Sequence, residues 1–381
     1  MTAPKNRRIA LHAQIGGYLR HSLIRGISSA LTKHPQVELL LEDGMPFPSW
    51  ETILKEQPDG LICTTLTDED IQHIRAYKKP VINVAELLPN ENTPAVFVDN
   101  YACGTIAGEH LHNSGLKHFG YIGVQIGINS EKRLDGFRSQ LPEGSSYEVF
   151  KIQIDTPWPK LVEKLVDWIQ PLPKPIGLYV FSDVYARAAV EAAHRLHLRI
   201  PQDIAVVGTG NYDLDTMISR PPLSSVPLNW RKVGYLATQH LLKAIEGESI
   251  PPVTHVSPRP IVIRESSNIF YAQDPAVAKA LSFIKANYRR PIQVDDVAAA
   301  AGMSRRALEL RFRQATDSTV HTFIHSLRLR KAQTLLLDTN DTIDAIAQAS
   351  GFREARLLIA AMKKQVGLTP GAYRKQSAIQ T

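Results

Sequence analysis

The sequence predicts a two-lobed α/β domain over residues 1–270 and an all-α domain with two helix-turn-helix motifs over residues 275–381. Three observations carry this prediction. Short apolar runs alternate with amphipathic helical segments from Arg8 to about Pro260. The last third of the chain repeats one helical pattern twice, and positive charge is concentrated there. A chain of 381 residues is long enough for two or three domains with separate cores.

The α/β domain is predicted from near-continuous apolar strands that alternate with helices. Segments such as 60–63 and 204–208 lack the polar alternation of half-exposed strands, which indicates a parallel sheet covered by helices on both faces. About 250 residues of this pattern suffice for two lobes with a hinge between them. The expected strands are 9–13, 37–41, 60–63, 80–84, 95–98, 118–123, 148–154, 177–181, 204–208, 254–256 and 261–264, and the expected helices are 18–34, 49–56, 68–78, 104–113, 159–170, 185–196 and 232–246.

Candidate ligand-binding residues follow the predicted strands. In open α/β sheets, ligands bind beyond the carboxyl ends of the strands, and between the lobes when there are two. Polar side chains at these positions supply carboxylates, amides and a guanidinium, which suit a hydroxyl-rich ligand. Any single one of them can also be interpreted as an ordinary polar loop residue. The candidates are His12, Gln14, Glu86, Arg133, Ser182, Asp183 and Asn211.

The all-α domain is predicted from an internal repeat within 291–374. Each copy has an amphipathic helix, a glycine-containing turn at Gly302 or Gly351, and a second helix, which is the helix-turn-helix pattern. The two motifs are expected at about 292–315 and 341–366. The matched core positions are Val294, Val297, Ala298, Leu308 and Phe312 in the first copy and Ile343, Ile346, Ala347, Leu358 and Met362 in the second.

The second helix of each motif carries the candidate DNA-binding residues. N-terminal residues of a recognition helix reach base edges in the major groove, where Arg can bind guanine bidentately and Glu can accept from cytosine. The alternative is a solvent-exposed face with ion pairs between residues four apart, such as Arg305 and Glu309. Between the motifs, a helix over 320–337 is expected to act as a rigid spacer. The candidates are Arg305, Arg306, Glu309, Arg313, Arg353, Glu354 and Arg356.

Charge is distributed unevenly along the chain. Residues 1–274 hold 27 Lys and Arg against 29 Asp and Glu, whereas residues 275–381 hold 17 against 8. The first part is therefore close to neutral, and the second part accounts for the net charge of +7. This asymmetry is typical of a nucleic-acid-binding module joined to a near-neutral domain. Double-stranded DNA is the expected partner of the basic part.

The remaining composition argues against several classes of protein. A hydrophobic fraction of 44% and a charged fraction of 21% describe an ordinary globular chain. Cys63 and Cys103 lie among apolar residues without metal-ligand spacing, so we expect reduced structural thiols, no metal and no cofactor. No signal-peptide core follows residues 1–8, and no run of roughly 20 apolar residues occurs. We therefore expect a soluble cytoplasmic protein without a membrane partner.

Five short motifs of the first domain form a family pattern. They are Asp99-Asn100 with Gly104, the stretch Ser-Glu-Lys-Arg-Leu-Asp-Gly-Phe at 130–137, Ser182-Asp183 with Ala186, the stretch Arg-Ile-Pro-Gln-Asp-Ile-Ala-Val-Val-Gly at 199–208, and Pro-Leu-Ser-Ser-Val at 222–226. Together they resemble the effector domain of lactose-repressor-type regulators, which has a periplasmic-binding-protein-like (type I) fold. The resemblance covers residues 8 to about 265. It implies that Arg133 clasps sugar hydroxyls and that Ser182 stands where a ligand-contacting Asn is usual.

One position departs from this family pattern. An Asp that binds the sugar is usual two residues after the glycine that ends the Val-Val-Gly strand. This chain has Gly210 there, followed by Asn211 and Asp213. Either Asn211 or Asp213 substitutes for the missing carboxylate, or the pocket holds a different effector.

The motifs of the second domain form another family pattern. They are Gly302-Met-Ser304, Leu308 with Arg311-Phe312, Arg328-Leu329 with Ala332 and Leu335-Leu336, Ile346-Ala347 with Gly351-Phe352, and a tail from Lys363 to Arg374 with Pro370 and Tyr373. They resemble the DNA-binding domain of arabinose-operon (AraC-type) regulators over all of 291–374. Asp317 stands where a Gly is usual, and Leu358 and Met362 replace a common Phe pair. Asp tolerates turns and Leu and Met pack well, so we expect the fold to be kept.

The two resemblances together match the architecture of xylose-operon regulators. This match implies a sugar-responsive, sequence-specific transcriptional regulator, more in keeping with an activator that contacts RNA polymerase, and a homodimer formed through the first domain. A sugar that binds one conformation better would close the lobes and reposition the DNA-binding domains. Regulation by a different, non-pentose carbohydrate, repression, and a nucleoid-type DNA binder stay open. A further alternative is an enzyme in which Glu86 and Asp183 form a general acid and base, as in glycoside hydrolysis.

Overall fold

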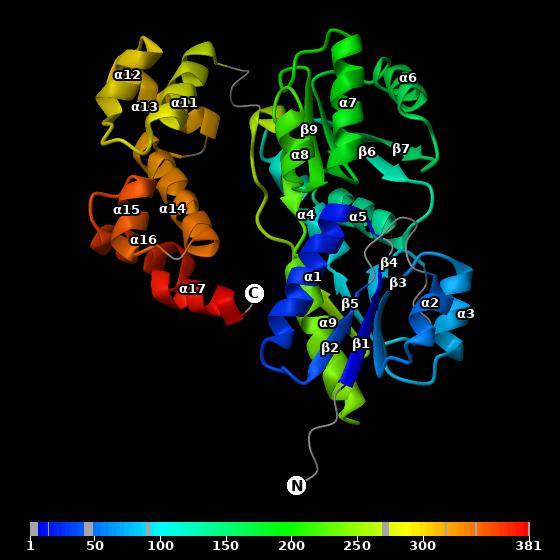
Figure 1. Cartoon of the computed structure of the whole chain (residues 1–381). Helices are drawn as coiled ribbons and strands as arrows, with labels where there is room; N and C mark the ends of the chain where they lie inside the picture. The colour runs from blue at the N-terminus through cyan, green and yellow to red at the C-terminus, as the bar shows by residue number, and fades with distance from the viewer. Residues whose placement is uncertain are drawn as a thin grey trace. The chain divides into compact units, whose positions relative to one another are not determined.

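The computed structural model of the chain describes residues 7–13, 15–41, 49–88, 92–268, 274–316, 318–339 and 341–379. It divides into two compact units, Met1–Ser267 and Asn268–Thr381 (Figure 1). Residues 271–273 between the two expected domains, the candidate Gln14 and the departure at Asp317 lie outside the described residues. None of the described helices is long and apolar enough to cross a membrane.

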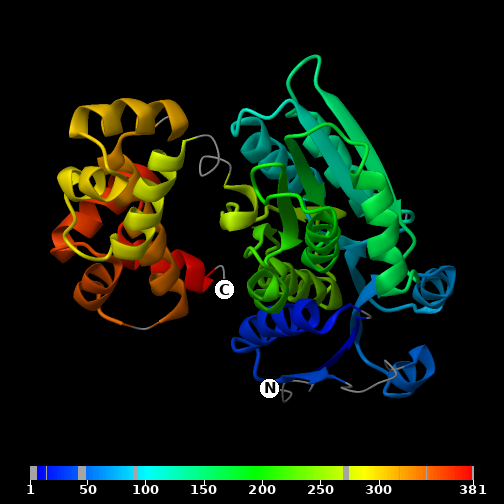
Figure 2. The same ribbon diagram turned by 90° about the horizontal axis from the view of Figure 1, so that it is seen from above.

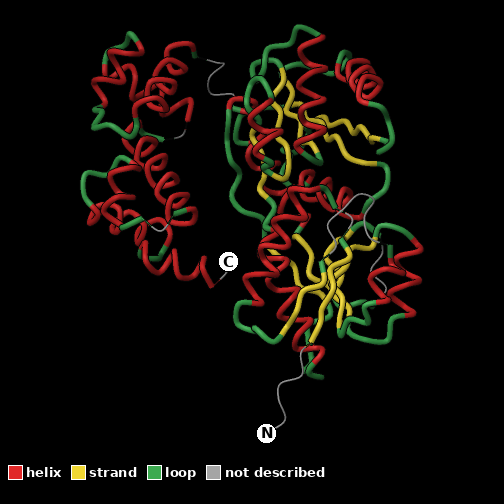
Figure 3. The backbone as a smooth tube through the Cα atoms, in the orientation of Figure 1, coloured by secondary structure: helices red, strands yellow, loops and turns green. Residues whose placement is uncertain are grey.

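The first lobe of the first unit is a six-stranded parallel sheet with the order β11-β5-β4-β3-β1-β2. Both β3 and β4 are buried along their whole length, as their continuous apolar sequence predicts. Helices flank the strands (Figure 3). The strands are β1 Arg7–His12, β2 Val37–Leu40, β3 Gly60–Thr65, β4 Val81–Glu86, β5 Ala95–Val98 and β11 Val253–Val256, and the helices are α1 Gly17–Leu31, α2 Trp50–Lys55, α3 Asp68–Ala76 and α9 Trp230–Ile245.

The second lobe is a five-stranded parallel sheet with the order β10-β9-β8-β6-β7. Its core includes Leu165, Leu178 and Val206, which are fully buried between the sheet and its helices. The strands are β6 His118–Val124, β7 Ser146–Ile152, β8 Ile176–Val180, β9 Ile204–Gly210 and β10 Ser224–Pro227, and the helices are α4 Asn100–His112, α5 Ile128–Arg138, α6 Trp158–Ile169, α7 Asp183–Arg195 and α8 Asp213–Ile218.

The chain passes between the lobes three times. Strand β5 belongs to the first sheet, but α4, which follows it, packs against α5 of the second lobe. After β10 of the second sheet, α9 returns to pack on α1 and on the first sheet. After β11 the chain crosses again, because Val262 forms an isolated bridge with Ser225 of β10. The carboxyl ends of both parallel sheets therefore lie next to the crossovers.

Several elements differ from the sequence expectations. Helix α4 begins at Asn100, four residues earlier than expected, because Asp99 caps it through a hydrogen bond from Ala102 N. Helix α5, helix α8 and strand β10 were not expected as elements. The strand expected at 261–264 is wrong. That segment follows two prolines and forms only the antiparallel bridge of Val262, because proline cannot donate to a strand ladder.

The described part of the second unit is all-helical (Figure 2), and the helix pair α12–α13 is repeated by the pair α15–α16, as predicted. Gly302 and Gly351 both end their helices in the left-handed conformation that the turn requires. Each motif has its own core, centred on Leu308 in the first and Leu358 in the second, and α14 contributes to both. The helices are α11 Pro275–Asn287, α12 Val294–Ala301, α13 Arg305–Thr316, α14 Val320–Asp338, α15 Ile343–Ser350, α16 Ala355–Val366 and α17 Pro370–Ile379.

Candidate functional site

The position of α5 in the second lobe is fixed by its close crossing with α4. A Cβ atom on Gly104 would lie 2.0 Å from the Arg133 carbonyl oxygen, and one on Gly136 would lie 2.0 Å from the Tyr101 carbonyl oxygen. Only glycine permits this approach, so both helix axes are held together at the point where α5 carries its functional side chain. The glycines of the two family motifs therefore serve to place Arg133.

The Arg133 side chain is buried, at 5% exposure, and is held by neutral partners. Its Nε donates to Asn100 Oδ1 at 3.0 Å, and its Nη1 donates to the Phe181 carbonyl oxygen at 2.6 Å. Its guanidinium carbon lies 4.6 Å from the centre of the Phe181 ring, in a cation–π contact. No carboxylate of the described chain forms an ion pair with it. Arg133 thus joins the start of α4 to the end of β8 while its charge stays unneutralised.

Glu86, at the end of β4, lies at the junction of the two lobes. One carboxylate oxygen pairs with Lys132 Nζ of α5, and the other accepts from Asn100 Nδ2 at 3.2 Å. Ile128 N also donates to the Leu87 carbonyl oxygen at 3.1 Å. A continuous chain of hydrogen bonds therefore runs from Lys132 through Glu86 and Asn100 to Arg133. This chain, which we call the crossover network, ties the first lobe to the second.

Asp183, at the start of α7, is fully buried, and both its oxygens accept from protein donors. Oδ1 accepts from the Ser225 hydroxyl at 2.6 Å, and Oδ2 accepts from Tyr212 N at 2.8 Å. Burial raises the pKa of Asp183 to about 6, although these two hydrogen bonds act in the opposite direction. Its neighbour Ser182 is half-buried and caps α7 by accepting from Tyr185 N at 3.5 Å. The geometry gives Asp183 the role of holding the loop after β9.

The loop after β9 explains the departure at Gly210. Gly210 has φ +123°, and a Cβ atom there would lie 2.4–2.8 Å from ring atoms of Tyr212. The Tyr212 ring lies 5.1 Å from the Tyr18 ring of the first lobe, in an edge-to-face contact. An aromatic ring therefore occupies the space into which a side chain at position 210 would project. That ring also contacts the opposite lobe.

The two substitutes considered for the missing carboxylate are placed differently. Asn211 is half-buried with φ +56°, and its Oδ1 accepts from Arg264 Nη2 at 2.8 Å. Asp213 is exposed at the first turn of α8. The amide of Asn211 thus takes part in the hydrogen bonds that hold the loop after β9, whereas Asp213 faces solvent.

His12, at the end of β1, belongs to a different cluster in the first lobe. It is buried, with its ring 4.1 Å from the Trp50 ring and its Nε2 3.8 Å from Asp70 Oδ1. Trp50 Nε1 donates to the same Asp70 oxygen at 2.8 Å. Hydrogen bonds from His12, Trp50 and two backbone amides hold the pKa of Asp70 well below its usual range despite its burial. His12 therefore packs within its own lobe, beside Trp50.

In the first motif, Arg305 and Arg306 stand side by side at the start of α13 with different surroundings. Arg305 pairs with Asp295 at 3.2 Å and with Glu309 at 3.3 Å, so the ion pair of the alternative interpretation is present. Arg306 is exposed and pairs with no carboxylate of the described chain, and the same holds for Arg313 at the far end of the helix. Arg306 is thus available to DNA without breaking an ion pair.

In the second motif, Glu354 is the N-cap residue of α16, preceded by the exposed Arg353. Arg356 Nε lies 2.5 Å from Glu354 Oε2, and their side chains are 79% and 52% exposed. An ion pair this exposed contributes little to stability, so it presents a small barrier to rearrangement on DNA. All three candidates lie at the amino-terminal end of the helix.

The two units match separate family models. Residues 109–267 match the periplasmic binding protein-like domain, and residues 297–376 match a helix-turn-helix domain. The xylose operon regulatory protein of Escherichia coli (strain K12) is 31% identical to this chain over 286 residues, which is 73% of each protein. The chain belongs to the xylose-operon-regulator family.

Two further members of the xylose-operon-regulator family match across both units. The xylose operon regulatory protein of Haemophilus influenzae (strain Rd) is 27% identical over 352 residues, covering 88% of this chain and 90% of that protein. The solved structure of the xylose-binding transcription activator XylR covers 99% of both chains with a TM-score of 0.62 at 26% identity. The predicted fold class, a periplasmic-binding-protein-like unit followed by an AraC-type helix-turn-helix unit, is confirmed.

Membership of the xylose-operon-regulator family excludes the alternative that this chain is a glycoside-hydrolysing enzyme. The family consists of transcriptional regulators rather than enzymes, so the proposed acid/base pair of Glu86 and Asp183 is wrong. The geometry gives the physical reason. Asp183 uses both oxygens to hold the loop after β9, and Glu86 uses both to hold Lys132 and Asn100.

The seven candidate ligand-binding residues leave out several side chains of the regulator's first unit that the structure places at the lobe junction. Lys132 and Phe181 contact Glu86 and Arg133, and Tyr18 and Tyr212 contact each other between the lobes. Lys132 adjoins a candidate, and Phe181 directly follows an apolar strand, so a search for neighbours of strand ends would have included them. Nothing in the sequence signals the contact between the two tyrosines.

Proposed function

We propose that this chain is a cytoplasmic, pentose-responsive activator of a carbohydrate utilisation operon, with D-xylose as the first candidate effector. At the coarser level the chain is a sugar-binding transcriptional regulator with an AraC-type DNA-binding unit. The names of its relatives supply xylose, because they are xylose operon regulatory proteins or a xylose-binding activator. Residues 1–270 form the sensing domain and residues 275–381 the DNA-binding domain.

The single observation that carries the sensing proposal is the crossover network. It places Arg133 and Asn100 beside the point where the chain passes between lobes, and it couples them to Glu86 of the first lobe. Glu86 and Asp183 already accept from protein donors, whereas the Arg133 guanidinium has only neutral partners. Such a site suits a neutral ligand whose hydroxyls accept from Arg133 and bond to half-buried polar groups such as Ser182.

A ligand held at this junction contacts both lobes, so it stabilises the conformation in which they approach. It changes the equilibrium only through its difference in affinity between open and closed forms. In a homodimer formed through the sensing domains, this closure repositions the two DNA-binding domains and their contact with RNA polymerase. Arg306, Arg313, Arg353 and Arg356 supply the DNA contacts, with Arg305, Glu309 and Glu354 in the ion pairs beside them.

The geometry of the loop after β9 supports a second candidate function, that of a regulator of the same architecture that responds to a different carbohydrate. Tyr212 fills the space at Gly210 that a sugar-binding Asp would occupy. An aromatic ring favours the apolar face of a sugar over a particular hydroxyl, so the preferred sugar depends on ring shape. Repression in place of activation remains compatible with this geometry.

A sugar panel tests the sensing proposal. We expect D-xylose to raise the melting temperature of the full chain and to alter its footprint on DNA, and L-arabinose, D-ribose and D-glucose to do less. Ligand at about 100 times its Kd stabilises a protein by roughly 2.7 kcal/mol, which is readily measured. A different sugar with the largest effect would favour the second candidate. The sugar-sensing proposal would be overturned if none of the panel changed melting or footprint.

A further inference from the structure

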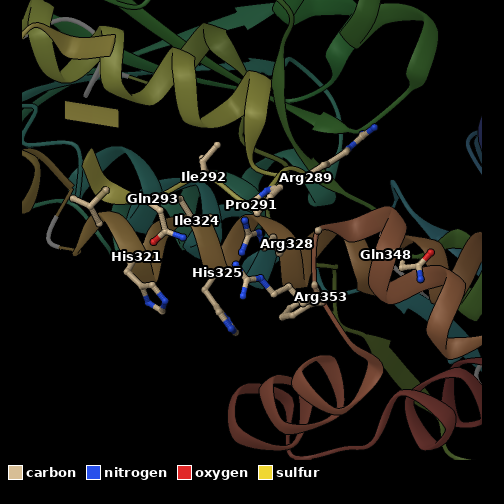
Figure 4. A pocket seen from close by; sticks show the side chains of 13 residues that line it. Arg289, Pro291, Ile292, Gln293, His321, Ile324, His325, Arg328, Gln348 and Arg353 are labelled. Atoms are coloured by element: carbon tan, nitrogen blue, oxygen red, sulfur yellow. The ribbon is translucent and has the colours of Figure 1, made fainter. Parts of the chain in front are cut away.

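A groove of about 500 Å³ separates the two helix-turn-helix motifs of the second unit (Figure 4). We call it the inter-motif groove. Residues before α12 border it on the first-motif side, the turn between α15 and α16 borders it on the other, and α14 lies between them. Its charged and titratable lining residues are Arg289, Arg328, Arg353, His321 and His325. No Asp or Glu lines it, which sets it apart from the ion-paired surface of α13.

One cation of the inter-motif groove is fixed in place. Arg328 Nε donates to the Tyr288 carbonyl oxygen at 2.7 Å, and Arg328 Nη2 donates to the Arg290 carbonyl oxygen at 2.8 Å. These partners orient the guanidinium without neutralising it. Burial lowers the pKa of Arg328, and the nearby Arg353 charge lowers it further. The groove therefore holds a preorganised positive potential that an anion would relieve.

Two histidines extend this cationic lining along α14. His321 is exposed, and His325, one turn later, is half-buried, with 6.0 Å between the ring centres. The His325 ring packs edge-on against Phe352 at 5.2 Å. In Figure 4, His321, His325 and Arg353 point to the same side of α14. Because Arg353 lies directly before Glu354, the N-cap residue of α16, this side is also the one on which the second recognition helix begins.

The surroundings of His325 favour its neutral form in the free protein. Burial is the largest cause of its lowered pKa, followed by His321, Arg328 and Lys364 of α16. Phe352, which faces it from the turn before α16, is uncharged, and the groove presents no carboxylate to it. A bound anion would reverse this balance, because a nearby negative charge favours the protonated imidazole.

The position of the inter-motif groove indicates which anion enters it. Two recognition helices that read successive major-groove segments lie about 34 Å apart along the duplex. When α13 and α16 enter two such segments, the sugar–phosphate backbone between them passes the part of the chain that joins the motifs, which is α14. Phosphate oxygens are therefore the anions presented to His321, His325 and Arg353.

We propose that the inter-motif groove binds a backbone phosphate of DNA, and that His321 and His325 take up protons as it binds, so that DNA affinity rises as pH falls. This inference rests on the proposed DNA-binding function and adds a site and a pH dependence to it. Phosphate contacts of this kind position the protein without reading sequence. The effect is therefore expected on any duplex, including one of random sequence.

The test uses the full chain and a random-sequence duplex of about 30 base pairs, long enough for two successive major-groove segments. Fluorescence anisotropy gives Kd at about pH 6 and about pH 8, around the ordinary histidine pKa, over a range of salt concentrations. We expect wild type to bind roughly 5–10-fold more tightly at the lower pH, and H321Q/H325Q to lose most of that difference. The slope of log K against log salt should also fall by about 1 in the variant.

Two further variants keep the result interpretable. The single variant His321→Gln alters only an exposed side chain and should show part of the effect even if the double variant melts early. The control His118→Gln removes a histidine of the first unit, whose Nδ1 lies 2.7 Å from Ser146 Oγ, and should leave both pH dependence and salt slope unchanged.

Three results would count against the inference. A folded H321Q/H325Q variant with wild-type affinity at both pH values overturns it while leaving DNA binding intact. If inorganic phosphate stabilises the chain without DNA and the histidine variants bind duplex normally, the groove binds free phosphate and not a DNA phosphate, and the proposal fails. If wild type binds no duplex even at low salt, the proposed DNA-binding function itself is wrong.

Discussion

Charged side chains have different partners in the sensor unit and in the inter-motif groove. In the sensor, Glu86 pairs with Lys132, and Asp183 accepts from Ser225 and a backbone amide. In the groove, three arginines and two histidines line one space without a carboxylate among them. The first arrangement pairs its carboxylates and leaves the single guanidinium of Arg133 with neutral partners, whereas the second gathers several arginines without a carboxylate.

This difference teaches what each unit is suited to bind. A neutral sugar gains from oriented donors and acceptors, and the sensor supplies these around a single guanidinium, that of Arg133. A phosphate requires concentrated positive charge, and the salt dependence of its binding follows from that requirement. The three predictions below test the two halves of the comparison, beginning with the largest expected effect.

Of the three variants, Arg133→Ala should lower the stability of the sensor unit most. Arg133→Ala leaves Asn100 Oδ1 and the Phe181 carbonyl oxygen without their donors in a buried region. Each buried acceptor left unpaired costs about 1–3 kcal/mol, so we expect a loss of about 2–5 kcal/mol in the free energy of unfolding. The sugar-induced rise in melting temperature should disappear as well. Urea denaturation and melting with D-xylose measure both effects.

A matched control for this variant lies on the same helix. Arg138→Ala removes an exposed arginine whose only described ring contact is with Tyr147, at 5.1 Å. We expect it to change the free energy of unfolding by less than about 0.5 kcal/mol and to keep the sugar response. An Arg133→Ala protein that still responded fully to sugar would remove Arg133 from the ligand site.

Restoring the family carboxylate should disrupt the loop after β9. Gly210→Asp places a side chain at φ +123° and within 2.4–2.8 Å of the Tyr212 ring. Backbone strain and overpacking each cost about 1–3 kcal/mol, so we expect a loss of about 2–4 kcal/mol in the free energy of unfolding. Thermal melting with and without the sugar panel measures the loss and any change of preferred sugar.

Two companion variants separate strain from steric overlap. G210D/Y212A removes the ring and should recover part of the stability. Gly144→Asp also creates a positive-φ Asp, at +78°, but with no atom within 4 Å of its Cβ, so it should cost about 1 kcal/mol or less. If Gly210→Asp were as mild as Gly144→Asp, Tyr212 would not occupy the space we assign to it.

Removing Arg306 tests whether the second unit also reads sequence. Because Arg306 has no ion pair to break, Arg306→Ala should cost about 1–3 kcal/mol on a preferred site and relax the preference at one position. Selection from a random duplex library, followed by binding measurements on the selected and scrambled sites, gives both quantities. Glu309→Ala removes one of the two ion pairs of Arg305 and should change affinity less. Equal weakening on every sequence would make Arg306 a phosphate contact.

The sequence anticipated the elements better than the contacts. The repeat at 291–374 predicted both motifs, because a helix period and a helix-ending glycine are local properties. The same holds for the buried strands β3 and β4, whose apolar runs need no partner to be recognised. The strand expected at 261–264 was wrong, because its apolar residues do not reveal that only Val262 pairs, with Ser225 of β10.

The candidate site shows the same division. The polar residues at strand ends could be named in advance, but their roles depend on distant partners. Arg133 meets the Phe181 carbonyl 48 positions away, and Asp183 meets Ser225 42 positions away. Asp183, a candidate ligand contact from its position alone, has both oxygens occupied by such partners. That Asp183 contacts the ligand therefore stays a prediction. Its geometry favours a role in positioning the loop after β9.

The sequence by itself determined two α/β lobes, a basic helical unit and an internal repeat, because hydrophobic period, glycine positions and charge are written along the chain. Only the tertiary structure decided that Tyr212 fills the space at Gly210, that Glu86 holds Lys132, and that three arginines and two histidines share one groove between the motifs. The physical reason is that these are contacts between segments far apart in sequence. Their partners, burial and net charge exist only after the chain has folded.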